Sequence, residues 1–336
     1  MPAKPTTVAL QAALTSALAQ YAELMGQPFP RVPELDLHSD ADFWALAELE
    51  GGGFAIRVGG GVVPMLERLW GDAFSDEDFT EGVSLPLVAD KVDAIHVSLV
   101  WLIFHEMQHF ELGHFDLIGS SIISETERGK AFSLASRGSI SSERVKNFGD
   151  APQFLIEQCL ELQADHDGAE LVLDAYSTDE WPSLRARIAA ISAMMMLIER
   201  EDAKLVEQAQ SSHPKAATRI FQLLGHVMEM PLIPAQRKAI LNGADAIDPA
   251  DLPSDAEQSA FNREVVIPAF FDAVNLARVA GAQSIRQDLG EAGAFFQDVQ
   301  IAKIGDVDAF ESLQTVGAKQ WAELVVINEQ LKADHS

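Results

Sequence analysis

The sequence predicts an α+β fold that is mainly helical, with a small antiparallel sheet or hairpin packed on a buried helix. Apolar residues recur at helical spacing along much of the chain, and they alternate as in a strand over residues 54–58. An almost wholly apolar run, residues 97–104, leads directly into a pair of histidines. With 336 residues, of which 48% are hydrophobic, the chain can form one large domain or two modest ones.

Charge and cysteine content narrow the classes of function. Asp and Glu number 51 against 24 Lys and Arg, which gives a formal net charge of −27. This balance argues against binding to nucleic acid or anionic lipid. Cys159 is the single cysteine, so no intramolecular disulfide can form, which fits a reducing compartment. No apolar run reaches transmembrane length, and we expect a cytoplasmic protein without a transmembrane segment.

The N-terminus allows two interpretations. Lys4 and the apolar residues 8–18 resemble a weak signal peptide, which would direct export. However, Thr15 and other polar residues dilute that segment, and a helical stripe from Leu10 to Leu24 continues past any cleavage site. We therefore predict an amphipathic helix over residues 5–26.

Short elements are predicted between this helix and the apolar run. They are a Pro-rich break at 27–33, a short helix at 40–50, a β-hairpin at 51–64, a helix at 65–71 and an acidic loop at 71–81. In the hairpin, Phe54, Ile56 and Val58 form one strand, and Val62 and Val63 begin the return strand. The glycines of this segment match neither GxxxxGK(S/T) nor a helix-opening GxGxxG, which argues against nucleotide binding.

The helix predicted over residues 92–114 contains the sequence His105-Glu106-Met107-Gln108-His109. Positions i and i+4 share one helix face, so His105 and His109 can present two imidazoles to one metal ion. Glu106 then lies beside the metal, where it can take a proton from a bound water. This HExxH spacing is typical of zinc hydrolases, and a third ligand would separate it from a surface helix that carries two histidines.

A second long helix, predicted over residues 152–174, offers that third ligand. Its acidic residues recur every four positions at Glu157, Glu161 and Asp165. Glu161 can bind the metal, and Asp165 can accept the far N–H of a liganding histidine and fix its tautomer. Glu157 is the fallback ligand, one turn earlier. A solvated acidic helix face would show the same spacing.

The rest of the chain is predicted to be largely helical. Residues 118–153 are expected to form a loop or flap over the site. Ser212 is a candidate helix cap and Pro214 a suitable first-turn residue, while His213 is either a surface histidine or a group that points at the metal. Further helices are expected at 182–210, 258–280 and 308–333, with a linker-like stretch at 231–257 and a mixed segment at 281–304.

Three segments, taken in order, resemble the gluzincin metallopeptidases related to the CAAX prenyl protease, including their soluble relatives. They are His105-Glu106-Met107-Gln108-His109, Glu161-Leu162-Gln163-Ala164-Asp165, and Ser212-His213-Pro214 followed by Arg219-Ile220. The family pattern is HExxH, then ExxxD, then Ser/Thr-His-Pro trailed by Arg-Ile. The hairpin at 51–64 is similar to one that precedes the metal helix in that family, where a strand can bind extended substrate by edge pairing.

This resemblance implies a zincin-like catalytic domain over residues 1–230. Residues 231–336 would form a helical region, either accessory or continuous with that domain. It also implies a peptide or protein substrate and one Zn²⁺ ion held by His105, His109 and Glu161. The transmembrane helices of the membrane-embedded relatives are not visible in this sequence.

Several roles follow from the resemblance. Glu106 would act as general base, and Asp165 would orient a histidine ligand. His213 or Arg219 would stabilise the oxyanion, although Arg219 could equally hold Asp165 in a salt bridge. His114 would be either an extra ligand or the end of the metal helix.

Two other functions fit the same residues. A non-catalytic, metal-stabilised binding or regulatory protein would have the same ligands and a closed coordination sphere, filled by His114 or His213. A cytosolic toxin or phage-defence protease, similar to the phage-exclusion protease Lit, would share HExxH and differ only in its target.

Overall fold

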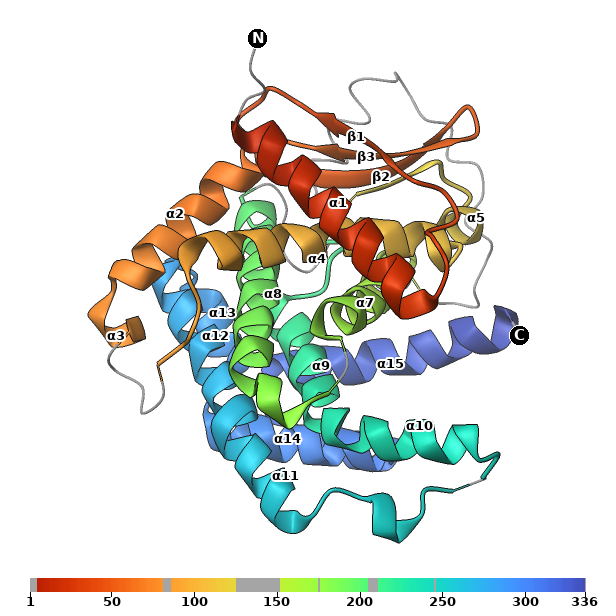
Figure 1. The fold of residues 1–336 in the computed structure, drawn as a ribbon, viewed down its shortest axis with the longest axis vertical. Helices are drawn as coiled ribbons and strands as arrows, with labels where there is room; N and C mark the ends of the chain where they lie inside the picture. The colour runs from red at the N-terminus through yellow and green to blue at the C-terminus, as the bar shows by residue number, and fades with distance from the viewer. Residues whose placement is uncertain are drawn as a thin grey trace.

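Helices make up most of the described chain, and a four-stranded sheet lies over one side of them (Figure 1). The computed structural model describes residues 5–80, 86–124, 152–174, 176–204, 211–244 and 246–335. The longer helices are α1 (Pro5–Met25), α2 (Val62–Ser75), α4 (Lys91–Glu111), α7 (Gln153–Leu173), α8 (Trp181–Asp202), α9 (Ala216–Glu229), α12 (Ile267–Val279), α14 (Ala292–Ile304) and α15 (Val316–His335). The predicted α+β, mainly helical fold class is confirmed.

Shorter helical segments connect these helices. They are α3 (Glu77–Thr80), α5 (His114–Ile118), α10 (Ile233–Leu241), α11 (Asp255–Phe261), α13 (Gln283–Leu289), the 3₁₀ turns at Thr178–Glu180, Met230–Leu232, Pro249–Asp251 and Val307–Ser312, and a π-helical segment at Asn262–Val266. The linker predicted at 231–257 was therefore wrong in part, because Pro234 stands in the first turn of α10, where a missing N–H costs nothing. The mixed segment at 281–304 consists of α13 and α14.

The sheet is mixed, with strand order β1-β3-β2-β4. Its strands are β1 (Glu34–Leu37), β2 (Ala45–Glu50), β3 (Gly53–Val58) and β4 (Ile122–Ser124). β1 pairs in parallel with β3, whereas β2 pairs antiparallel with both β3 and β4. Phe54, Ile56 and Val58 alternate inward along β3, as the sequence pattern predicts.

The hairpin is formed by β2 and β3, whereas the sequence predicted a hairpin of β3 with a later strand beginning at Val62. Residues 40–50, expected as a short helix, contribute β2, and the turn to β3 is made by Gly51 and Gly52, whose φ angles are +56° and +86°. Val62 and Val63, expected to begin a return strand, begin α2 instead. Gly60, just before α2, allows the backbone to pack closely against Asp40, since a Cβ at this position would lie 2.4 Å from the Asp40 carbonyl oxygen.

The central element is α4, which lies between the sheet, α1 and α2 on one side and α7 and α8 on the other (Figure 1). Every residue from Ser98 to His109 is buried, so the helix is enclosed on all faces. Its first turn is capped by the Asp90 carboxylate, which accepts a hydrogen bond from the Asp93 amide. The acidic loop predicted at 71–81 is largely helical, since α2 continues to Ser75 and α3 follows it.

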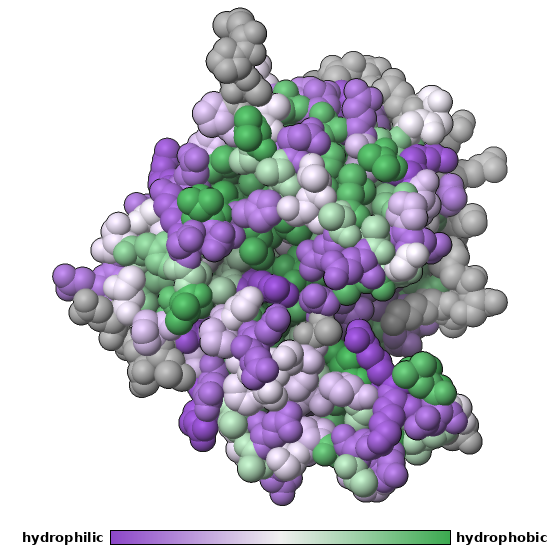
Figure 2. Space-filling model, in the orientation of Figure 1, coloured by the Kyte–Doolittle hydropathy of each residue, from purple (hydrophilic) through white to green (hydrophobic). Residues whose placement is uncertain are grey.

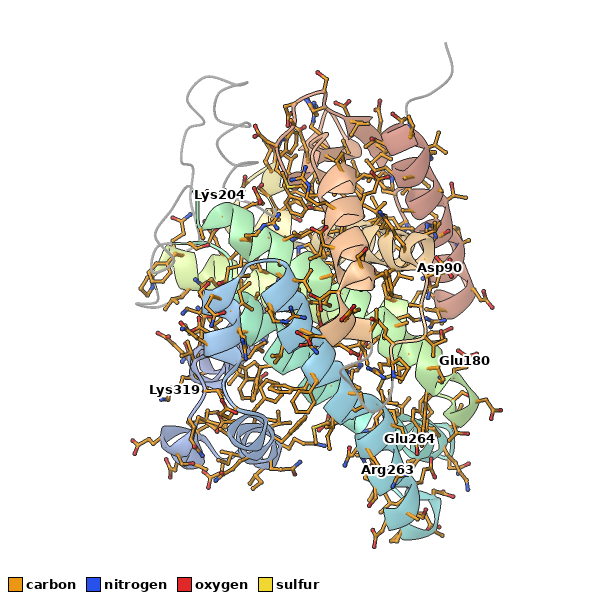
Figure 3. All side chains as sticks on the ribbon, turned by 90° about the vertical axis from the view of Figure 1, so that its left-hand side faces the viewer. Asp90, Glu180, Lys204, Arg263, Glu264 and Lys319 are labelled. Atoms are coloured by element: carbon orange, nitrogen blue, oxygen red, sulfur yellow. The ribbon has the colours of Figure 1, made fainter. Side chains whose placement is uncertain are left out.

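The carboxyl-terminal helices pack against the same core. α8, whose ends are marked by Glu180 and Lys204 in Figure 3, contacts α4, α9 and α12, and α15 contacts both α7 and α9. One hydrophobic cluster extends from Leu10 in α1 to Ala322 in α15. Figure 2 shows hydrophilic and hydrophobic residues interspersed on the face that carries α1 and α2. Among the described helices, none is both long and apolar enough to cross a membrane.

Candidate metal centre

The carboxyl-terminal half of α4 brings His105, Glu106 and His109 into the core. All three residues are fully buried. The i,i+4 spacing turns the two imidazoles to one side of the helix, and their Nε2 atoms lie 3.1 Å apart. Two like ring nitrogens at this separation need a proton or a cation between them, because two lone pairs repel each other.

Glu161 of α7 faces this histidine pair. Its carboxylate oxygens lie 3.2 Å from His105 Nε2 and 3.6 Å from His109 Nε2. The approach of α7 is made possible by Gly168, where a Cβ would lie 3.2 Å from the His105 backbone nitrogen. Glu157, the fallback ligand, is half-buried and accepts a hydrogen bond from Gln153 at the start of the helix.

The separations of these donor atoms fit one metal ion. Zinc bonds of 2.0–2.2 Å in a tetrahedron place neighbouring donors about 3.3–3.6 Å apart. The two imidazole nitrogens are 3.1 Å apart, Glu161 Oε2 lies 3.2 Å from His105 Nε2, and Glu161 Oε1 lies 3.6 Å from His109 Nε2. Two imidazole nitrogens and one carboxylate oxygen are also a donor set that zinc prefers. His105, His109 and Glu161 therefore fit a zinc ion by geometry and by chemistry.

Acidic side chains lie beside the histidines. Glu106, Glu161 and Asp165 are buried carboxylates, and Asp165 is paired with the buried Arg219 guanidinium. A buried carboxylate is costly unless a cation or hydrogen-bond donors compensate its charge. Carboxylate oxygens next to two imidazoles are compatible with a bound divalent cation.

The far nitrogen of His105 is held by Asp165. His105 Nδ1 lies 3.0 Å from Asp165 Oδ1, and Arg219 binds both oxygens of the same carboxylate at 2.6 and 2.5 Å. The Asp165 carboxylate beside Nδ1 favours the tautomer that carries its proton on that atom, which leaves the lone pair of His105 on Nε2, where a metal would bind. The Arg219 guanidinium also lies over the Trp101 ring, 5.5 Å from its centre.

The far nitrogen of His109 is held by a chain of side chains that the sequence interpretation did not identify. Gln163 Oε1 lies 2.9 Å from His114 Nε2, and His114 Nδ1 lies 2.9 Å from His109 Nδ1. An amide oxygen can only accept, so His114 donates from Nε2 and accepts at Nδ1 from His109. His109 then keeps its lone pair on Nε2, the metal-facing atom. His114 therefore contacts His109 on the side away from the metal position. Gly113, with φ +72°, lies between the end of α4 and His114.

The chain of hydrogen bonds continues into the last helix. The side-chain amide of Gln163 donates to Asn328 Oδ1 of α15. The only sequence signal for this chain was His114 itself, five positions after His109, because Gln163 and Asn328 are distant in sequence from it.

His213 occupies a different polar cluster. Its Nε2 lies 2.8 Å from the Ser124 carbonyl oxygen, and its Nδ1 lies 2.8 Å from Asp202 Oδ2. His213 is 5% exposed, so the surface-histidine interpretation is wrong. Ser212 and Pro214 precede α9, whose first residue is Ala216 and whose first amide donates to Glu199 of α8. The predicted cap at Ser212 was therefore wrong, because α8 supplies the acceptor.

The sheet presents different edges from those expected. Both strands of the β2–β3 hairpin are interior, so the expectation that one of them pairs with substrate is not met in the described residues. The outer strands there are β1 and β4. Of the flap predicted at 118–153, Ile122–Ser124 form β4, and residues 125–151 lie outside the described part of the chain.

Comparison with protein-family models, with curated proteins and with solved structures gives no match.

Proposed function

We propose that the protein is a zinc-dependent metallopeptidase of the gluzincin type, with a zincin-like catalytic domain. The observation that carries this proposal is the convergence of His105, His109 and Glu161 in the buried core. HExxH followed by a glutamate on a second helix is the ligand order of that class, and both helices are present at contact distance.

In this proposal the zinc ion, when bound, lowers the pKa of a water molecule and polarises the peptide carbonyl. Glu106 takes the proton from that water and passes it to the leaving amine. Glu106 suits this role because it is fully buried at the same end of α4 as the two histidines.

The neighbouring residues position the ligands. Asp165 fixes the tautomer of His105, and Arg219 holds Asp165 through two hydrogen bonds, which favours a positioning role for Arg219 over direct contact with substrate. His114 does the same for His109. His213 binds the last residue of β4, and we assign it to positioning that strand.

The substrate in this proposal is a peptide or protein in extended conformation. An extended chain can bind along an outer strand of a sheet through main-chain hydrogen bonds. Of the outer strands, β4 follows the metal helix directly in sequence through α5, and it ends beside His213. We therefore assign β4, not the β2–β3 hairpin, as the strand that receives substrate.

The test is Glu106→Gln, which preserves size and removes the base. The variant should bind zinc with the stoichiometry of the parent and hydrolyse a peptide pool slower by on the order of 10²–10⁴-fold. Glu111→Gln, at an exposed position on the same helix, is the matched control and should retain activity.

Equal hydrolysis by Glu106→Gln would rule out this mechanism. A zinc-loaded parent that cleaves nothing in the pool would instead favour the metal-stabilised binding protein. Proteomic comparison of cells expressing the parent or Glu106→Gln would then identify the cleaved proteins.

A further inference from the structure

A second group of metal-ligating side chains lies on the opposite side of α7. His166 and Glu170 of α7 face His226 of α9. His166 is five positions after Glu161 and Glu170 is nine, which correspond to rotations of about 140° and 180° around the helix. The group is therefore separate from His105, His109 and Glu161, although the same helix carries both.

The separations within this group match those expected around one metal ion. Glu170 Oε1 lies 3.5 Å from His166 Nε2 and 3.8 Å from His226 Nδ1. Neither separation is short enough for an ordinary N–H···O hydrogen bond. Both are close to the spacing of about 3.3–3.6 Å between donors that share a tetrahedral zinc ion.

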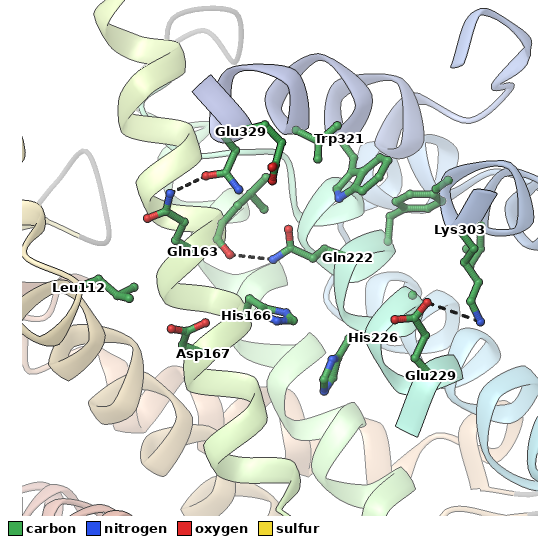
Figure 4. Close-up of a pocket in the computed structure, with 17 residues that line it drawn as sticks. Leu112, Gln163, His166, Asp167, Gln222, His226, Glu229, Lys303, Trp321 and Glu329 are labelled. Atoms are coloured by element: carbon green, nitrogen blue, oxygen red, sulfur yellow. Dashed lines mark hydrogen bonds and ion pairs between the residues drawn. The ribbon is translucent and has the colours of Figure 1, made fainter. Parts of the chain in front are cut away.

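The two rings are arranged so that one nitrogen of each faces the same carboxylate oxygen. Their planes are 88° apart and their centres 4.9 Å apart, and Figure 4 shows the two side chains pointing toward one another from α7 and α9.

The three side chains differ in their exposure to solvent. The side chain of His226 is 13% exposed. The side chains of His166 and Glu170 are 39% and 53% exposed, which gives an ion access from solvent.

A pocket of about 450 Å³ opens beside the two histidines (Figure 4). His166 and His226 line it together with apolar side chains from three helices, including Phe221, Val299 and Trp321. An ion held by the three ligands would have its remaining coordination positions open to solvent or to a small molecule in this pocket.

We propose that His166, Glu170 and His226 form a second binding site, which takes one divalent transition-metal ion of the zinc type. Two imidazoles and a single carboxylate select Zn²⁺, Co²⁺, Ni²⁺ or Cu²⁺ over Ca²⁺ and Mg²⁺, which prefer oxygen donors. The bound ion would connect α7 to α9, the helix that carries Arg219. This site does not depend on the proposed peptidase activity.

The test is a binding titration of tag-free, chelator-treated full-length protein with Co²⁺, monitored by absorbance and by metal analysis after dialysis. The parent should bind two ions per chain. Glu170→Gln and His166→Ala should each lose one ion, while Glu161→Ala should retain the ion at the second site. Because His166 and Glu170 are exposed, circular dichroism of the apo variants should match the parent.

Two control variants each change one glutamate or one histidine that lies outside the proposed second site. Glu180→Gln changes a glutamate whose side chain is 58% exposed, and His38→Ala removes a histidine that lies 3.4 Å from the Asp36 carboxylate. Neither should change the number of bound ions. The proposal is overturned if the His166→Ala, Glu170→Gln double variant binds as many ions as the parent. It is also overturned if Glu161→Ala abolishes all binding, which would leave only the first site.

Discussion

At the scale of single residues, each histidine of the candidate zinc site has an acceptor beside its Nδ1 atom, the ring nitrogen that faces away from the metal position. The Asp165 carboxylate lies beside Nδ1 of His105, and His114 accepts a hydrogen bond from Nδ1 of His109. Each histidine is therefore fixed in the tautomer that places its lone pair on Nε2. Two different acceptors, a carboxylate and an imidazole, produce the same result on adjacent ligands.

Glu161→Ala removes a ligand and should lower the zinc content of purified protein well below one ion at the first site. Loss of a carboxylate also removes one of the buried negative charges that attract the cation. Metal analysis at a fixed free zinc concentration, set by a chelator buffer, measures the change. Glu157→Ala, one turn earlier, is the matched control. If both variants bind zinc equally, Glu161 is not a ligand.

The residues of this site differ in how far the sequence predicts them. His105, Glu106 and His109 lie within five consecutive positions, and helix geometry alone places the histidines together. Glu161 and Asp165 were predicted from their spacing on a second helix. The His114–Gln163–Asn328 chain was not predicted, because it joins three helices and depends on how they pack.

At the scale of elements, the distance between α4 and α7 sets the geometry of the site. Gly168 lets α7 approach the backbone of α4 at His105, and this neighbour is main chain in a fully buried helix, which cannot move aside easily. A methyl group at this position would push Glu161 and Asp165 away from the histidines.

Gly168→Ala should therefore weaken zinc binding and destabilise the protein by about 1–3 kcal/mol, the usual cost of overpacking. Gly225→Ala in α9 is the control, because a Cβ there meets nothing within 4 Å. That control should gain up to about 1 kcal/mol from the better helix propensity of alanine. Urea unfolding of the apo proteins and zinc competition assays measure both effects. A Gly168→Ala variant at least as stable as Gly225→Ala would contradict this account of the packing.

Among the elements, long amphipathic or apolar helices were predicted well, whereas the sheet was predicted poorly. Residues 43–48 are buried continuously, so β2 lacks the alternation that marks a half-exposed strand. β1 and β4 are only four and three residues long, too short for a pattern to be recognised. Pro234 at the start of α10 resembled a break, because the preference of proline for the first helical turn can be recognised only where the start of the helix is known.

At the scale of the whole molecule, the candidate site joins two central helices, α4 and α7. A metal ion bound there would hold these helices together, and it would bind the folded chain in preference to the unfolded one. We therefore expect the stability of the protein to depend on the metal.

Chelation should lower the melting temperature, because zinc that binds only the folded protein adds about 2.7 kcal/mol of stability at a free concentration 100 times its dissociation constant. Differential scanning calorimetry with and without a chelator, followed by zinc re-addition, tests this. Glu161→Ala lacks a ligand of the first site, so chelation should lower its melting temperature by less than it lowers that of the parent. An unchanged melting temperature in the chelated parent would show that the core does not need a cation.

Helix α15 connects the candidate site to a part of the molecule that supplies none of its ligands. Asn328 of α15 is the outermost member of the hydrogen-bonded chain that orients His109, and α15 also covers α7 through Leu324 and Leu331. A partner or ligand that displaced α15 would therefore change the orientation of His109 without contacting any metal ligand. Such a displacement would weaken metal binding from a distance.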